Sequence, residues 1–175
     1  ANEERFGHAQ TYGADLLTQA RAGAATAELE LLNDTYAEVS EAMVRRARLA
    51  DVAVMQPNDE TFSLTQGAAE EVLFGSGRPV IFVPFIQKGG LKLDRVMICW
   101  DGSRAATRAV ADSLPLLKKA KQVEVVIVAT GRPKSDEVPG ADLGQHLARH
   151  GLKVDVKRIT SPDIDVPSTI LSYAA

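Results

Sequence analysis

A polar corner stands where an apolar stretch of the sequence gives way to an alanine-rich one. Residues 95–103 read RVMICWDGS, so Asp101, Gly102 and Ser103 directly follow the apolar run and Trp100. A serine at this place can cap a helix through its hydroxyl, and glycine lets the backbone turn sharply. The first amides of such a helix favour an anion such as phosphate, and Asp101 can accept a hydrogen bond from a ribose hydroxyl or an adenine amino group. The corner has two interpretations, a plain strand-to-helix turn and a nucleotide contact.

Other chemically active residues lack the neighbours that a site needs. Cys99 lies inside the apolar run with no basic neighbour to lower its pKa, so we expect a buried structural thiol. His146 and His150 are four positions apart, but no cluster near them completes a metal site, and we expect a solvated helix end. The segment 130–132, TGR, is interpreted as a plain loop. Because no P-loop, GxGxxG or GxSxG pattern and no nucleophile–base pair is present, we predict no catalytic residue and no metal ligand.

Composition limits the classes of partner. The chain has 175 residues, a net charge of −3 and one cysteine. The charge argues against a broad nucleic-acid-binding surface, and the single cysteine excludes an intrachain disulfide framework and fits a reducing compartment. No apolar stretch approaches the roughly 20 residues that span a membrane, and residues 1–10 lack the apolar core of a signal peptide. We expect a cytoplasmic protein that contacts neither nucleic acid nor membrane.

Helix and strand patterns alternate along the chain and predict an α/β protein. Helices are expected over residues 6–20, 35–50, 65–74, 103–119, 141–150 and from about 165 onward. Strands are expected at 28–32, 51–56, 79–85, 95–100, 123–129 and 152–159. Thr35-x-x-Glu38 has the form of a capping box. The strand 79–85 is apolar at nearly every position, which suits a parallel sheet covered on both faces. We therefore predict an open, mainly parallel sheet with helices on both faces.

The segment 86–92, IQKGGLK, joins two strand patterns but is too short for the crossover that adjacent parallel strands require. Either these strands form an antiparallel hairpin or a domain boundary falls here. We predict a boundary after residue 88, because the alternation of elements restarts beyond it. In a further alternative, strands 51–56 and 79–85 join strand 95–100 in one shared sheet.

Residues 94–129, from DRVMICWDGSRAATRAV to VEVVIVA, resemble the opening of a universal stress protein domain. The segments ARLADVAVMQ and GAAEEVLFGSGRPVIFVPF resemble the end of such a domain, with its fourth strand and its last helix and strand. The resemblance implies the C-terminal part of one domain in residues 1–88 and the N-terminal part of a second in 89–175. It thus implies a tandem protein that is partial at both ends. It also implies parallel sheets with the strand order 3-2-1-4-5.

Some members of this family bind ATP or AMP, and others do not. Those that bind carry a glycine-rich pattern, G-x2-G-x9-G-[ST], after the fourth strand. Here Gln56 and Asp59 replace the first two glycines, Gly67 matches the third, and Ala68 replaces the hydroxyl residue. The spacing is also shorter, and the acidic pair of Asp59 and Glu60 repels phosphate. The first half of the chain therefore contains only a degenerate form of the family's nucleotide-binding pattern.

The second half keeps the polar corner, but the family's phosphate cradle is not in this sequence. The resemblance implies that Asp101 lies near the adenosine and that the end of the next strand meets the adenine. The candidate ATP- or AMP-binding residues are Trp100, Asp101, Gly102, Ser103, Val128 and Ala129. We expect a nucleotide-binding stress-response module. The alternatives are a scaffold that works without nucleotide and an enzyme of the related adenine-nucleotide-hydrolase type, which needs a glycine-rich phosphate loop.

The strand Pro79–Phe85 is expected to be the last of its sheet and therefore an edge. Edge strands must be covered or paired. In the family that this chain resembles, the last strands commonly pair between domains or subunits. We therefore expect Val80–Val83 to lie at a domain–domain or subunit interface, and we expect self-association, as a dimer, through this strand.

Overall fold

The chain forms two compact units, Ala1–Phe85 and Ile86–Ala175, which divide three positions before the expected boundary after residue 88. The computed structural model describes residues 2–23, 25–56, 64–84, 86–87, 89–129, 140–160 and 165–175. The strands in these ranges form two separate sheets, in the orders β1-β2 and β3-β4-β5. All strand pairs in both sheets are parallel, which confirms the α/β fold class. Both the hairpin and the single shared sheet are therefore wrong for this part of the chain.

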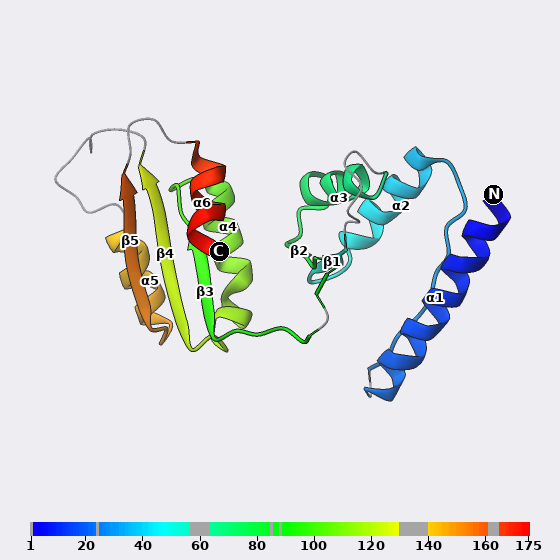
Figure 1. Ribbon diagram of the computed structural model, residues 1–175, viewed down its shortest axis with the longest axis horizontal. Helices are drawn as coiled ribbons and strands as arrows, with labels where there is room; N and C mark the ends of the chain where they lie inside the picture. Colours follow the sequence, from blue (N-terminus) through cyan, green and yellow to red (C-terminus); the bar gives the residue numbers. More distant parts are fainter. Residues whose placement is uncertain are drawn as a thin grey trace. The chain divides into compact units, whose positions relative to one another are not determined.

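The first unit combines three helices with a short sheet (Figure 1). Its elements are α1 (Asn2–Ala22), α2 (Tyr36–Ala47), β1 (Ala53–Met55), α3 (Leu64–Gly75) and β2 (Val80–Phe82). The capping box that starts α2 is confirmed, because Thr35 Oγ1 accepts from the Glu38 N–H and the Glu38 carboxylate accepts from the Thr35 N–H. The helices and strands of this unit therefore lie close to the positions that periodicity predicts, with one exception.

The strand expected at residues 28–32 is wrong, because residues 25–35 form no strand. Within the described residues β1 pairs with β2 alone, so this segment has no neighbouring strand to bond. The segment packs against helices α1 and α2 instead. Leu29 packs on Gly13 of α1, where a Cβ would lie 2.7 Å from Leu29 Cδ1, and Glu30 forms an ion pair with Arg46 of α2. Alternation of apolar residues predicted an extended backbone but not the absence of a partner strand.

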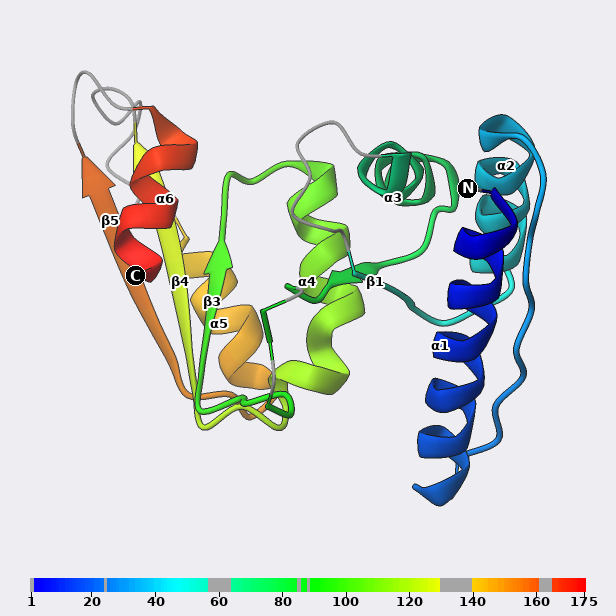
Figure 2. The same cartoon turned by 45° about the vertical axis from the view of Figure 1, so that its right-hand side comes forward.

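The second unit is a three-stranded sheet with helices on both faces (Figures 1 and 2). Its elements are β3 (Arg95–Cys99), α4 (Arg104–Leu117), β4 (Gln122–Ala129), α5 (Ala141–Arg149), β5 (Val154–Thr160) and α6 (Val166–Ala174). One face of the sheet packs on α4 and α5, and α6 lies on the other face. The core contains Ile98, Val110, Leu117, Val123, Val125, Ile127, Leu143 and Leu147. No helix in the described ranges is long and apolar enough to cross a membrane.

Candidate functional site

The carboxyl ends of β3 and β4 lie side by side, at the edge toward which the strand arrows point in Figure 1. Cys99 is the register partner of Val126, and the Trp100 N–H donates to the Val126 carbonyl at 2.9 Å. Asp101 therefore follows β3 at the level where Val128 and Ala129 end β4. The six residues predicted from the sequence lie together at one edge of this sheet.

The Asp101–Ser103 corner is a capped strand-to-helix turn. The Ser103 N–H donates to Asp101 Oδ1 at 2.8 Å, and Ser103 Oγ accepts from the Ala106 N–H at 3.1 Å to cap α4. Gly102 has a φ of +76° with open space around it. Hydrogen bonds from Ser103 hold the pKa of Asp101 below its usual range, so the exposed carboxylate is charged at neutral pH. A carboxylate has about four lone-pair sites, so it retains acceptor capacity beyond the turn.

The strand β3 directs its side chains differently from what the apolar run suggested. Ile98 is buried in the core and Trp100 packs against it. Because side chains alternate along a strand, Cys99 lies on the opposite face, and its side chain is exposed. The expectation of a buried thiol is therefore wrong. Partial burial still raises the pKa of Cys99, which keeps the thiol protonated at neutral pH.

Gly67, the one glycine of the first half that matches the family pattern, lies inside α3. A Cβ at this position would overlap the Tyr36 hydroxyl of α2, so the glycine permits close packing of two helices. Ala68 is buried beside it. Gln56 directly follows β1, whereas Asp59 and Glu60 lie outside the described residues. Packing accounts for Gly67 without a phosphate ligand.

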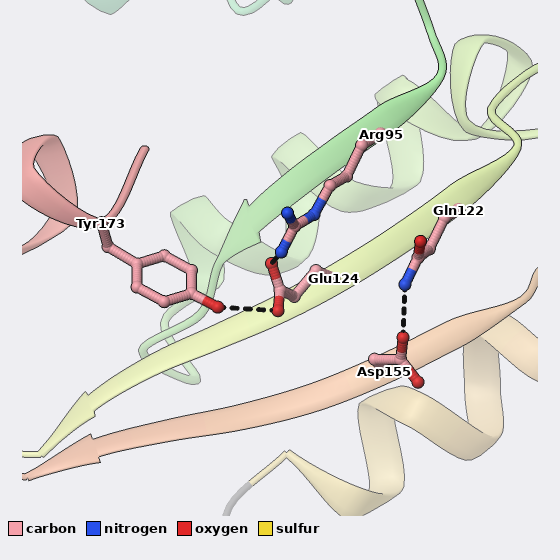
Figure 3. Close-up of polar contacts among 5 residues, drawn as sticks. All are labelled: Arg95, Gln122, Glu124, Asp155 and Tyr173. Atoms are coloured by element: carbon pink, nitrogen blue, oxygen red, sulfur yellow. Dashed lines mark hydrogen bonds and ion pairs between the residues drawn. The ribbon is translucent and has the colours of Figure 1, made fainter. Parts of the chain in front are cut away.

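A polar network on the α6 face of the sheet was not predicted from the sequence (Figure 3). The carboxylate of Glu124, a buried residue of the central strand, accepts from the Tyr173 hydroxyl at 2.8 Å and from Arg95 at 2.7 Å. These hydrogen bonds, with that from Tyr173 first, lower the pKa of Glu124. The Lys157 ammonium lies 5.2 Å from the centroid of the Tyr173 ring. A glutamate inside the run VEVVIVA was the available signal, because a buried charge needs partners.

His146 of α5 and His150, the C-cap residue of that helix, are exposed, and their ring centroids lie 4.8 Å apart in an edge-to-face arrangement. Among the residues that the structure describes, no group of three or more His, Cys, Asp or Glu side chains could hold a metal ion. The loop residues 130–132 lie outside the described part of the chain.

No protein-family model and no curated protein matches this chain. Among solved structures, it is similar to a universal stress protein from Archaeoglobus fulgidus DSM 4304, with a TM-score of 0.68 and 19% sequence identity. The chain has the universal stress protein fold. The similarity covers 98% of this chain and 64% of that protein, so the chain spans less than two thirds of its length. Within this fold the observed orders β5-β4-β3 and β1-β2 agree with strands 3-2-1 and 4-5. The tandem arrangement and the partial ends remain predictions.

Proposed function

We propose that the chain is a stress-response module of the universal stress protein type whose second unit binds ATP or AMP. The observation that carries this proposal is the position of the charged, exposed Asp101 beside the end of β4. In open parallel sheets, ligands bind beyond the carboxyl ends of the strands. Asp101 would accept a hydrogen bond from the ribose, and Val128 and Ala129 would lie against the adenine. The open space around Gly102 lets a ligand approach the backbone.

Calorimetric titration with ATP and AMP tests this proposal. Two variants of Asp101 separate its hydrogen bond within the turn from its contact with the ligand. Asp101→Asn keeps an acceptor for the Ser103 N–H but removes the charge and one acceptor oxygen. Asp101→Ala removes the charge and both acceptor oxygens, so the hydrogen bond of the turn is lost as well. We expect saturable binding by the intact protein and a loss of affinity of about tenfold or more in both variants, because a hydrogen bond to a charged group contributes about 1.5–3 kcal/mol.

The matched control is Asp155→Asn, which removes the same charge near the amino end of the edge strand β5, away from the carboxyl ends of the strands. Its affinity should equal that of the intact protein. Absence of saturable binding in the intact protein contradicts nucleotide binding. Wild-type affinity in Asp101→Asn, with loss only in Asp101→Ala, assigns the carboxylate to the turn and contradicts its contact with the ligand.

A second candidate function is a scaffold that works by self-association, and the β1-β2 sheet favours it. Among the described strands β2 pairs with β1 alone, and the side chains of Val54 and Phe82 are 63% and 43% exposed. A two-stranded sheet with exposed apolar side chains is unstable without a cover. We propose that Val80–Val83 pairs with a second copy of the chain.

Light scattering after size-exclusion chromatography tests the scaffold proposal. Phe82→Lys places a charge on the exposed strand and should convert a dimer to a monomer. Leu49→Lys, which changes a 91% exposed side chain outside the strands, should leave the dimer intact. A monomeric intact protein at high concentration, or a dimer that survives Phe82→Lys, contradicts pairing through β2.

A further inference from the structure

The helix α6 covers the face of the sheet that carries Glu124, and it starts at the edge of the sheet where Asp101 lies. Figures 1 and 2 both show α6 beginning at the carboxyl ends of β4 and β5 and running back against the direction of these strands. Because side chains alternate along β4, Val126 and Val128 share the face of Glu124. Val126 is buried and Val128 is half-buried. Val128, the proposed adenine contact, therefore lies on the face that α6 covers.

The first turn of α6 lies at the level of the last residues of β4. The Tyr173 ring is beside Lys157, which is the register partner of Val126. Val166 precedes Tyr173 by two helical turns on the same side of α6, and a rise of 1.5 Å per residue places it about 10 Å further along the sheet. A strand rises about 3.3 Å per residue, so this distance takes β4 from Val126 to about Ala129. Val166 therefore stands beside the end of β4.

The contact between α6 and the sheet is incomplete at its first turn. None of the residues of α6 is buried, and the residues that face the sheet, Val166, Ile170 and Tyr173, are half-buried. The hydrogen bond from the Tyr173 hydroxyl to Glu124 is at the opposite end of the helix from Val166. The described residues therefore cover the apolar side chain of Val166 only in part, and they hold the first turn by apolar contact alone.

We propose that α6 is a movable wall of the adenine site, with Val166 packed against the base, so that nucleotide binding holds this helix closed. This inference rests on the proposed nucleotide-binding function. A nucleotide with its ribose at Asp101 and its base at Val128 and Ala129 has the base within reach of Val166. The base would bury apolar surface that is half-exposed without ligand. A ligand that binds the closed form more tightly than the open form shifts the helix toward the closed form.

Hydrogen exchange of the unmodified protein, with and without AMP, tests this inference first. The informative amides are those of α6 that exchange faster than β4 without ligand, because they open locally. At saturating AMP we expect their exchange to slow about five- to tenfold, since the change equals the ratio of the affinities of the closed and open forms. Amides of α1, in the first unit, are the control and should not change.

Three outcomes of this experiment contradict a proposal. Unchanged exchange in α6, when calorimetry shows saturable AMP binding, overturns the movable wall and leaves nucleotide binding at Asp101 intact. Exchange in α6 that is no faster than in β4 without ligand also overturns it, because the helix then does not open by itself. Absence of AMP binding overturns the proposed function itself, so the two failures are distinguishable.

Substitution of Val166 tests its contact with the base. Val166→Ala removes two methyl groups and should weaken AMP binding about fivefold. Leu171→Ala shortens a side chain of the same helix that is 71% exposed, and it should leave the affinity unchanged. Tyr173→Phe loosens α6 from its other end, so it should speed exchange but change the AMP affinity less than about twofold. Unchanged affinity in Val166→Ala, or an equal loss in Tyr173→Phe, overturns the contact.

Discussion

Glu124 is a charged side chain in the central strand of the second unit, and its partners determine whether it stabilises the fold. Tyr173 donates to one carboxylate oxygen, and Arg95 donates to the other. The Arg95 side chain is 63% exposed, so water weakens its attraction, and the Tyr173 hydrogen bond is the stronger contribution. The lowered pKa of Glu124 means that the folded protein favours the charged carboxylate.

We expect Glu124→Gln to lower the free energy of unfolding by about 1–3 kcal/mol at pH 7, because it weakens hydrogen bonds to a charged acceptor. A depressed folded-state pKa contributes stability above the usual glutamate pKa, and this stability is lost as the pH falls through the folded-state pKa. The difference between the two proteins should therefore shrink below about pH 4. Denaturant unfolding from pH 3 to 7 measures it, and a difference that does not change with pH contradicts the assignment.

Gly140 shows a second constraint at the scale of one residue, because it combines a left-handed φ with close contact to Ile127. Gly140→Ala should lower the free energy of unfolding by at least about 2 kcal/mol, through backbone strain and overlap. Gly151→Ala is the matched control, since Gly151 has a φ of +82° but open space around it. It should cost only the strain, about 1 kcal/mol. Equal losses in thermal unfolding would show that the contact with Ile127 contributes nothing.

At the scale of elements, α6 differs from α4 and α5 in how it is attached to the sheet. None of its residues is buried, whereas α4 and α5 each contribute buried leucine side chains to the core. The Tyr173 side chain, which bonds Glu124 and lies beside Lys157, is the polar attachment of α6 (Figure 3). Because its inward-facing residues Val166, Ile170 and Tyr173 are only half-buried, α6 should open more readily than helices that contribute buried side chains to the core.

We expect Tyr173→Phe to speed amide exchange in Val166–Ala174 at least about tenfold, because the lost hydrogen bond to the charged Glu124 carboxylate contributes about 1.5–3 kcal/mol. Exchange in β4 should not change. Tyr12→Phe, which alters an exposed tyrosine of α1, should change neither. Hydrogen exchange with mass spectrometry measures all three, and unchanged exchange in α6 would mean that other contacts hold the helix.

At the scale of the whole chain, the two sheets differ in the number of their strand pairs and in the burial of their side chains. The central strand β4 bonds to β3 and β5 and carries five successive buried residues, Val123–Ile127. The strands β1 and β2 are three residues each and bond only to one another within the described residues. The free energy needed to open the chain locally should therefore differ between the two units.

Native-state hydrogen exchange should find the most slowly exchanging amides in β4, and those of β1 and β2 at least about a hundredfold faster, which corresponds to about 2.7 kcal/mol. The comparison needs dilute protein, because pairing through β2 would protect the first unit. Equal protection of β1 and β4 in a monomeric sample would contradict the difference between the sheets.

The sequence predicted the positions of the helices and strands better than it predicted what each of them packs against or pairs with. Periodicity and caps placed α2, α4 and β4 within a few residues, because these signals are local. The strand expected at 28–32 and the burial expected for Cys99 were wrong, because both depend on what lies beside a strand. The capped corner at Asp101 was predicted, since its hydrogen bonds connect neighbouring residues. The network of Glu124 was missed, because its partners Arg95 and Tyr173 lie 29 and 49 positions away in the sequence.

The parallel pairing of every described strand has a consequence for the speed of folding. Val96 pairs with Val123, 27 positions later, and Val123 pairs with Val154, 31 positions later. No hairpin exists in these sheets to start the pairing locally, so the chain must close long loops before any strand contact forms. During synthesis on the ribosome, one edge of the apolar β4 stays unpaired until β5 has emerged. Until then it is the segment most in need of a chaperone.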